Sequence, residues 1–291
     1  MRSIARKEDW EEMHSTMNYT IFMNSKVLDI LEPTWSVTNF GQHSCLLFFC
    51  KKKYGFSYFL QPFLTRVLEG YDQFDTTKWN DFFPKICQFQ LSYCPYSIPD
   101  NWEVKVMKYQ RVTLDIPLDK LEKNFSVNIR RILKKKDLFS VRKNIPLPEY
   151  FDFLMKHNKF FSKMNTELFL KFKKLIEYFD SSGLGEVLAI SDESHNCLAM
   201  SFFVFDTQSV IDFKGGVSEE GRKQGAMIIL HFKALSKYHG RFKYYDFYGA
   251  NSSKRASLNL KFGSENIEYF QFTRIDYPQP LKYLIRKVGS L

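Results

Sequence analysis

Strand-like and helix-like patterns alternate along the whole chain, and this mixing limits the possible folds more than any other feature. All-helical and all-strand architectures are excluded, and an α/β (α+β) fold with mixed sheets is expected. At 291 residues the chain is long enough for about two domains, each with its own core. In the first part we expect helices at Glu8–Met17, Asn24–Leu31 and Trp79–Phe89. We expect strands at Trp35–Thr38, Ser44–Cys50, Gly55–Leu60 and Glu103–Ile116, with a turn at residues 51–53.

The most regular segment follows Pro117 and predicts one helix over residues 118–136. Its apolar residues fall on one arc at 100° per residue, and its cations lie on the opposite arc. The apolar stripe comprises Leu118, Leu121, Phe125, Ile129, Ile132 and Leu133. The basic face comprises Lys120, Lys123, Arg130, Arg131, Lys134 and Lys135. Because a strand-rich run ends here, we predict two domains, residues 1–112 and 113–291.

The second part continues with the same alternation and ends in a helix that begins near Pro278. Glycines at 183 and 185 precede a strand, and a hairpin turn is expected at Ser194–Asn196. A loop over residues 217–226 then leads into a helix that ends near Tyr238. The other expected elements are strands at 139–142, 187–190, 197–205, 209–216, 243–248 and 267–273, and helices at 148–161, 165–179 and 253–261.

The excess of positive charge lies entirely in the second part. Residues 116–291 contain 29 Lys and Arg against 19 Asp and Glu, and the remainder of the chain is neutral. This asymmetry indicates an anionic partner such as phosphate, nucleic acid or an acidic substrate. A general excess of surface lysine, which favours solubility, explains it equally well.

Several classes of site are excluded by their motifs. The chain has no phosphate-binding Walker loop, nucleophile elbow or zinc-protease helix. Five cysteines without a C-x-x-C pair, and histidines without ligand spacing, predict neither a disulfide framework nor a metal site. The charged N-terminus and the lack of a long apolar run predict a cytoplasmic protein with no membrane span.

Four segments of the second part carry a resemblance to a known family: Asn128–Ile132, Tyr244–Gly249, Leu258–Gly263 and Ile267–Phe272. Together with the order of elements, they resemble the GNAT-superfamily acyltransferases, and more specifically the Fem-type peptidyltransferases. The resemblance covers residues 112–275, and over residues 1–111 it rests on layout alone. It implies two GNAT-like domains in tandem and transfer of an acyl or aminoacyl group to an amine.

The segment Arg222-Lys223-Gln224-Gly225-Ala226 is the candidate donor-binding loop. In GNAT enzymes such a loop holds the CoA pyrophosphate on backbone N–H groups at a helix N-terminus. Met227 replaces the small residue of that pattern, and Gly225 alone is also typical of an ordinary turn. Acyl-CoA is therefore a candidate co-substrate, and no tightly bound cofactor is expected. The resemblance to Fem-type enzymes implies aminoacyl-tRNA as the other candidate donor.

Asp246, Tyr248 and Lys261 are the candidate catalytic residues. Asp246 either takes a proton from the attacking amine or accepts backbone hydrogen bonds from the turn that follows. The resemblance places a carbonyl-polarising lysine at position 259, where this chain has Asn259, and Lys261 lies two residues further on.

The basic face supplies a candidate site for phosphate or RNA at Arg130, Arg131, Lys134 and Lys135. A solvated helix surface is the other interpretation of the same residues. The predicted function is thus acyl transfer from acyl-CoA or aminoacyl-tRNA to an amine acceptor. A catalytically silent relative that binds a nucleotide or RNA is the alternative, because Met227 and Asn259 depart from the family patterns.

Overall fold

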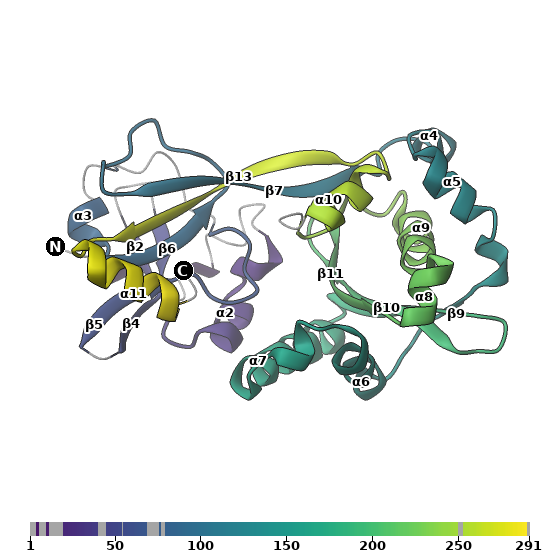
Figure 1. The fold of residues 1–291 in the computed structure, drawn as a ribbon, viewed down its shortest axis with the longest axis horizontal. Coiled ribbons are helices and arrows are strands. Elements are labelled where there is room, and N and C mark those ends of the chain that lie inside the picture. The colour runs from purple at the N-terminus through teal and green to yellow at the C-terminus, as the bar shows by residue number, and fades with distance from the viewer. Residues whose placement is uncertain are drawn as a thin grey trace. The chain divides into compact units, whose positions relative to one another are not determined.

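In this computed structural model the chain divides into two compact units. The structure describes residues 4–5, 10–11, 20–39, 45–53, 55–68, 76, 79–249 and 253–289. Unit 1 comprises residues 1–107 and 268–291, and unit 2 comprises residues 108–267. Strands β7 (Glu103–Thr113) and β13 (Glu265–Ile275) therefore each run from one unit into the other (Figure 1). In this division the last 24 residues group with unit 1, and the two GNAT-like domains over residues 1–112 and 113–291 stay a prediction.

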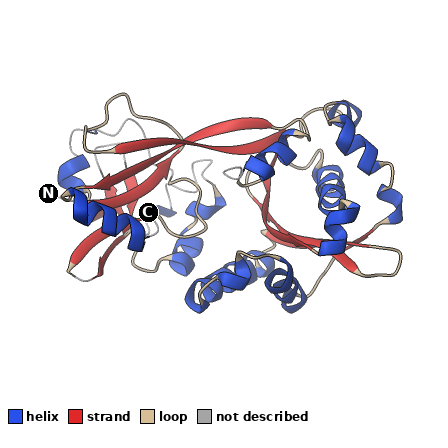
Figure 2. Ribbon diagram, viewed as in Figure 1, coloured by secondary structure: helices blue, strands red, loops and turns tan. Residues whose placement is uncertain are grey.

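Unit 1 contains a three-stranded sheet and the first four strands of a ten-stranded sheet. The three-stranded sheet has the order β1-β2-β3. The four strands have the order β4-β5-β6-β13, and among them the β5–β6 pair is parallel and the others are antiparallel. Helical elements lie between the strands and at the end of the chain (Figures 1 and 2). The elements are β1 (Ile4–Ala5), η1 (Ile21–Met23), α2 (Ser25–Leu31), β2 (Ser36–Asn39), β3 (Cys45–Phe48), β4 (Cys50–Lys53), β5 (Phe56–Leu60), α3 (Trp79–Phe82), β6 (Ile86–Leu91) and α11 (Gln279–Gly289).

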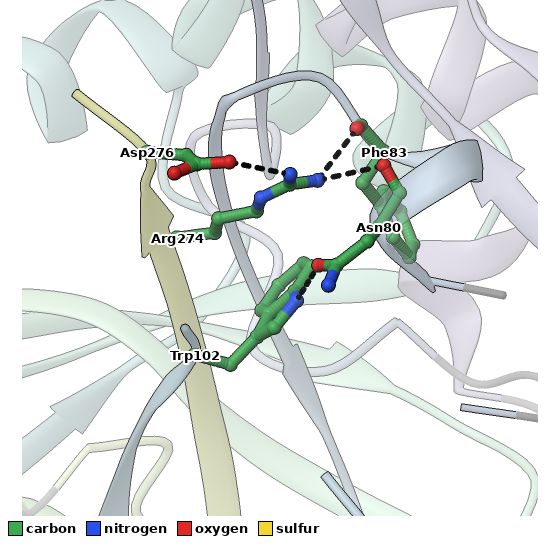
Figure 3. Close-up of polar contacts among 5 residues, drawn as sticks. All are labelled: Asn80, Phe83, Trp102, Arg274 and Asp276. Carbon is green, nitrogen blue, oxygen red and sulfur yellow. Dashed lines mark hydrogen bonds and ion pairs between the residues drawn. The ribbon is translucent and has the colours of Figure 1, made fainter. Parts of the chain in front are cut away.

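An aromatic cluster forms the core beside α3, and one buried arginine ends that helix. Trp79, Phe89 and Trp102 pack edge to face within about 6 Å of one another. The guanidinium of Arg274 donates to the backbone carbonyls of Asn80 and Phe83, at 3.0 and 3.1 Å (Figure 3). Its other terminal nitrogen donates to Asp276, and Trp102 donates to the side chain of Asn80.

Unit 2 contains the last six strands of the ten-stranded sheet, with helices on both faces. Their order is β7-β12-β11-β10-β9-β8, with β11 and β12 parallel and the other neighbouring strands antiparallel. Helices α8 and α9 pack on one face and α6 and α7 on the other. The elements are α4 (Leu118–Lys123), α5 (Val127–Leu133), η3 (Lys136–Leu138), β8 (Ser140–Arg142), α6 (Leu147–His157), η4 (Phe161–Lys163), α7 (Thr166–Ser181), β9 (Gly185–Ser191), β10 (Cys197–Phe205), β11 (Ser209–Val217), α8 (Glu219–Gln224), α9 (Ala226–Tyr238), β12 (Tyr244–Asp246) and α10 (Ser253–Leu260).

The predicted helix over 118–136 is broken, because α4 ends at Lys123 and α5 begins at Val127. The Ser126 side chain accepts from the N–H of Ile129 and so begins a new helix. The Ser126 N–H donates to the Lys261 carbonyl, and the Phe125 ring packs against Phe232 and Phe262. Capping and this tertiary contact therefore override a continuous amphipathic pattern.

Four other predicted elements differ from the structure. The helix predicted at Trp79–Phe89 ends at Phe82 and gives way to strand β6, because Pro84 disfavours helix for the residue before it. The predicted strand Ser44–Cys50 is two strands, β3 and β4, and residues 51–53 belong to β4 rather than to a turn. The predicted loop 217–226 contains helix α8, capped by Ser218. The predicted helix Glu8–Met17 lies mostly outside the described residues.

Candidate functional site

The site is organised around a bulge in strand β11. The pairing of β10 with β11 shifts so that Phe203 lies opposite Asp212 and Phe202 lies opposite Lys214, which leaves Phe213 unpaired. Opposed residues share a face of the sheet. The Phe203 ring packs on Tyr238 of α9, and the Phe202 ring packs on Tyr150 of α6. Asp212 therefore lies on the α9 face of the sheet and Lys214 on the α6 face.

A buried polar network surrounds Asp212. The hydroxyl of Ser201, which is fully buried on β10, donates to Asp212 Oδ1. The Nδ1 atom of His231 on α9 lies 3.9 Å from Asp212 Oδ2 and 2.8 Å from the hydroxyl of Tyr245. Burial lowers the pKa of His231, an effect that the Asp212 carboxylate partly offsets. Burial also raises the pKa of Tyr245. The imidazole is therefore neutral near pH 7, and the Tyr245 hydroxyl retains its proton.

This network forms part of the wall of a cavity of about 540 Å³, which we call the reaction cavity. Its polar lining includes Asp212, His231 and Asn259, and its cations are Arg222, Lys254 and Arg255. Asn259 is 2% exposed, and its Nδ2 has no hydrogen-bond partner among the described residues. The Asp212 carboxylate, which lies beside a neutral imidazole, can act as a proton acceptor there.

A second cavity, of about 730 Å³, which we call the cationic cavity, brings together the two cationic segments that the sequence singled out. Arg131 and Lys135, next to or within α5, line it together with Arg222 and Lys223 of α8. Asp192 and Glu193 of the β9–β10 turn also line it. The two cavities share Arg222, Gly225 and Ile228 in their walls. A ligand with an anionic part can therefore lie along both.

The candidate donor-binding loop is not an open row of N–H groups. The N–H of Arg222 donates to the Ser218 carbonyl, and that of Gly225 donates to the carbonyls of α8. Gln224 and Gly225 line the cationic cavity, whereas Met227 lines the reaction cavity and Ala226 is buried. Helix α9 begins at Ala226 with no side-chain cap, so its positive end lies beside the cations. Side chains, rather than the loop's backbone, supply most of the donors for an anion.

Gly225 is required at the junction of α8 and α9. Its φ is +76°, and a Cβ atom there would lie 2.9 Å from Cγ2 of Ile132 on α5. We therefore expect Gly225→Ala to destabilise unit 2 by about 1–3 kcal/mol through backbone strain and crowding. Calorimetric unfolding measures this loss. Gly240→Ala is the matched control, because its φ is also positive but its Cβ would meet no atom within 4 Å. Equal losses in the two variants would contradict the close approach of α5.

None of the three candidate catalytic residues lines the reaction cavity or the cationic cavity. Asp246 is buried and accepts from the N–H of Tyr248 at 2.6 Å, which is the turn-capping interaction considered above. Tyr248 has a left-handed backbone, with φ of 61°, and its ring packs on Phe213. Lys261 is exposed just after α10 and lines neither the reaction cavity nor the cationic cavity. The reaction cavity instead contains Asn259, at the position where the resemblance places a lysine.

Of the four candidate anion-binding residues, two lie at the cationic cavity. Arg130 and Lys134 are exposed on α5 and at its end, and they do not line that cavity. Arg130 donates to the Lys123 carbonyl, and Arg131 donates to Asn128. The basic face is therefore split between a concave site and open surface.

Sequence reasoning missed Asp212, Lys214 and the role of His231. A signal was present, because Asp212 and Lys214 are two charges inside a strand of otherwise apolar and glycine residues. The bulge that separates them has no signature in the sequence.

No family model and no curated protein matches the sequence. Solved structures do match over the whole chain. FemX is 11% identical, with a TM-score of 0.64, and the match covers 98% of this chain and 99% of FemX. The chain has a GNAT/Fem-like fold.

Two further structures have the same fold. A conserved protein of unknown function from Bacteroides thetaiotaomicron is 8% identical, with a TM-score of 0.57, over 94% of this chain and all of that one. L-PGS from Bacillus licheniformis is 11% identical, with a TM-score of 0.53, over 98% of this chain and 97% of that one. The expected mixed α/β class and the GNAT/Fem resemblance are confirmed. No helix in the described ranges has the length and apolar character needed to cross a membrane.

Proposed function

We propose that this protein transfers an acyl or aminoacyl group from acyl-CoA or aminoacyl-tRNA to an amine acceptor. The observation that carries the proposal is the shared wall of the two cavities. The cationic cavity suits the phosphates of either donor, and the adjoining reaction cavity contains a buried proton acceptor. The GNAT/Fem-like fold supports the same reaction class.

The residues suggest a direct transfer. The acceptor nitrogen forms a bond to the donor's carbonyl carbon, and the bond from that carbon to the leaving sulfur or oxygen breaks. The proton lost by the nitrogen passes to the Asp212 carboxylate, and the leaving group takes up a proton. His231 holds its imidazole close to Asp212, and Ser201 fixes the carboxylate's orientation. Catalysis then comes mainly from positioning and from this one proton transfer.

The arrangement of α8 supports aminoacyl-tRNA over acyl-CoA. The backbone donors that a pyrophosphate would need are engaged within α8, whereas four cationic side chains surround the cavity. Side-chain cations on two helices suit a chain of phosphates, which need not lie in one tight cradle. Met227, which lines the reaction cavity, also fills space that a small residue would leave open.

The proposal is tested by direct binding and transfer. Calorimetric titrations with acetyl-CoA, CoA and a mixture of aminoacylated tRNAs identify the donor. A transfer assay with a labelled aminoacyl group and a panel of primary amines then detects the product. If the protein binds none of acetyl-CoA, CoA and aminoacylated tRNA, the proposed donor site is wrong. Binding of tRNA without transfer to any amine would favour the catalytically silent alternative, which the departures at Met227 and Asn259 support.

The salt dependence of tRNA binding separates the cationic cavity from open surface. The double variant Arg131→Gln, Lys135→Gln should flatten the slope of log binding constant against log salt by about 1.4–1.8, the value for two phosphates. The exposed pair Arg130→Gln, Lys134→Gln is the matched control and should change the slope by less. Filter binding over a range of salt concentrations gives both slopes. A larger effect from the control pair would place the RNA site outside the cavity.

A further inference from the structure

A half-buried ammonium lies on the α6 face of β11, two residues along the strand from the proposed proton acceptor. The Nζ atom of Lys214 lies 5.0 Å from the ring centre of Tyr248, 5.5 Å from that of Phe213 and 5.8 Å from that of Phe160. The backbone holds it in place, because the Tyr150 hydroxyl donates to the Lys214 carbonyl at 2.9 Å. The Asn158 amide of α6 donates to the next carbonyl, that of Gly215, at 2.7 Å.

This ammonium has no counter-ion in the part of the chain that the structure describes. No carboxylate there lies within 4.0 Å of it, and Asp212 lies on the other face of the strand. Burial and, to a smaller extent, the Arg255 guanidinium lower the pKa of Lys214, Asp212 acts in the opposite direction, and the resulting pKa is about 8. The aromatic rings attract the charge, but their stabilisation does not offset its desolvation. The environment therefore favours an added negative charge.

The fold holds this aromatic cage at the cost of backbone strain. Tyr248 has a left-handed backbone, which is uncommon for an aromatic residue, and Asp246 fixes it by accepting its N–H. The Tyr248 ring is thereby held against Phe213 and over Lys214. Phe160, the third ring, is 51% exposed, so the cage borders solvent on that side. Strain that maintains a half-buried charge without a counter-ion indicates a ligand site rather than a stabilising element.

One face of β11 suits the donor and the other face suits the acceptor. The cationic cavity and the reaction cavity lie on the α9 side, with Asp212. Strand β12 pairs with β11 only at residues 209–211, so among the described residues this edge of β11 has no partner strand at Asp212 and Lys214. The nitrogen of the acceptor must approach the carbonyl carbon from a direction that the donor does not occupy, and this edge gives it access from the Lys214 side. We propose that Lys214 binds an anionic group of the acceptor, a carboxylate or a phosphate, through its ammonium. The acceptor is then an amine that also carries an acid, and this assignment rests on the function proposed above.

Anion binding at Lys214 has a distinctive dependence on pH. The anion binds the protonated amine, so its affinity is full below the pKa of about 8 and is lost as the pH rises through that value. Other charged or titratable groups near the amine are Asp212 on the same strand, Arg255 on α10, Tyr150 on α6 and Tyr248 after β12. Arginines and ordinary lysines keep their charge through this range, so the anion sites of the cationic cavity do not contribute the same change.

The experiment measures the rise in unfolding temperature that sodium acetate or sodium phosphate produces, by calorimetry, between about pH 7 and pH 9.5. The wild-type rise should shrink as the pH passes about 8, and Lys214→Gln should lack this pH-dependent part. Lys214→Arg should retain anion binding with no pH dependence, because arginine stays protonated. Acetate and phosphate, compared at equal ionic strength, show which acid is bound. The same pH profile in wild type and Lys214→Gln would overturn the proposal.

Two further readouts separate this proposal from the proposed function. Without added anion, Lys214→Met should raise the unfolding temperature near pH 7, because it removes a partly desolvated charge that has no counter-ion among the described residues. In a transfer assay, Lys214→Gln should raise KM for the acceptor about tenfold or more, with donor affinity unchanged. Failure of all transfer, with the anion effect present, would remove the acyltransferase but keep the anion site. A fall in kcat with KM unchanged would contradict acceptor binding by Lys214.

Discussion

Replacing Asp212 with Asn is expected to lower the rate of acyl transfer by about two to four orders of magnitude, the usual contribution of a general base. The substitution keeps the size of the side chain and an oxygen for the Ser201 hydroxyl, so unit 2 should remain folded. What is lost is the ability to accept a proton beside the neutral imidazole of His231. Single-turnover assays at saturating donor measure the effect on the chemical step.

Two other aspartates serve as comparisons for the Asp212→Asn prediction. Asp246→Asn tests the carboxylate that the sequence singled out; its new amide oxygen can still accept from the Tyr248 N–H, so the turn should persist. Asp206→Asn is the matched control, because Asp206 accepts from the N–H of Thr207 in the β10–β11 turn. We expect both to retain transfer within a few-fold of wild type. A loss for Asp246→Asn as large as that for Asp212→Asn would make Asp246 the base.

The parts of the site that the sequence predicts are those set by local pattern. Cations at a helical spacing and Gly225 before an apolar helix can be recognised in the sequence alone, and both lie at the cationic cavity. Their meeting in one cavity was not predictable, because Arg131 and Arg222 are brought together by α5 packing on α9. Asp212 was missed for a similar reason: only the bulge at Phe213 places it and Lys214 on opposite faces, two residues apart.

The boundaries of helices and strands were likewise predictable where a local pattern sets them. The alternation of strands and helices gave the mixed α/β class, and most elements of unit 2 lie where their patterns predict. The break at Ser126 has a local signal, a capping serine, and the strand after Pro84 has another, the proline itself. The prediction gave more weight to a continuous apolar stripe than to these signals. The assignment of residues 268–291 to unit 1 has no such signal. It depends on the pairing of β13 with β6, whose partners are about 180 residues apart in the sequence.

Arg274 shows how much such long-range contacts contribute, and its loss should have the largest effect on stability. Replacing it with Met is expected to lower the free energy of unfolding of unit 1 by about 3–5 kcal/mol, the range for breaking a buried charged network. The arginine is 5% exposed, and its guanidinium donates to the carbonyls of Asn80 and Phe83 at the end of α3 (Figure 3). Methionine has a similar length but no donor, so the hydrogen bonds to both carbonyls and the ion pair with Asp276 would be lost.

Tryptophan fluorescence in urea isolates this effect, because all four tryptophans of the chain, Trp10, Trp35, Trp79 and Trp102, lie in unit 1. Arg286→Met is the matched control. Arg286 also pairs with a carboxylate, that of Glu103, but the two side chains are 43% and 54% exposed, so its loss should cost about 1 kcal/mol or less. Equal midpoints for the two variants would mean that the Arg274 network contributes no more than a surface ion pair. A large shift for Arg274→Met alone would show that the end of the chain is an integral part of unit 1's core, because β13 delivers this guanidinium to α3.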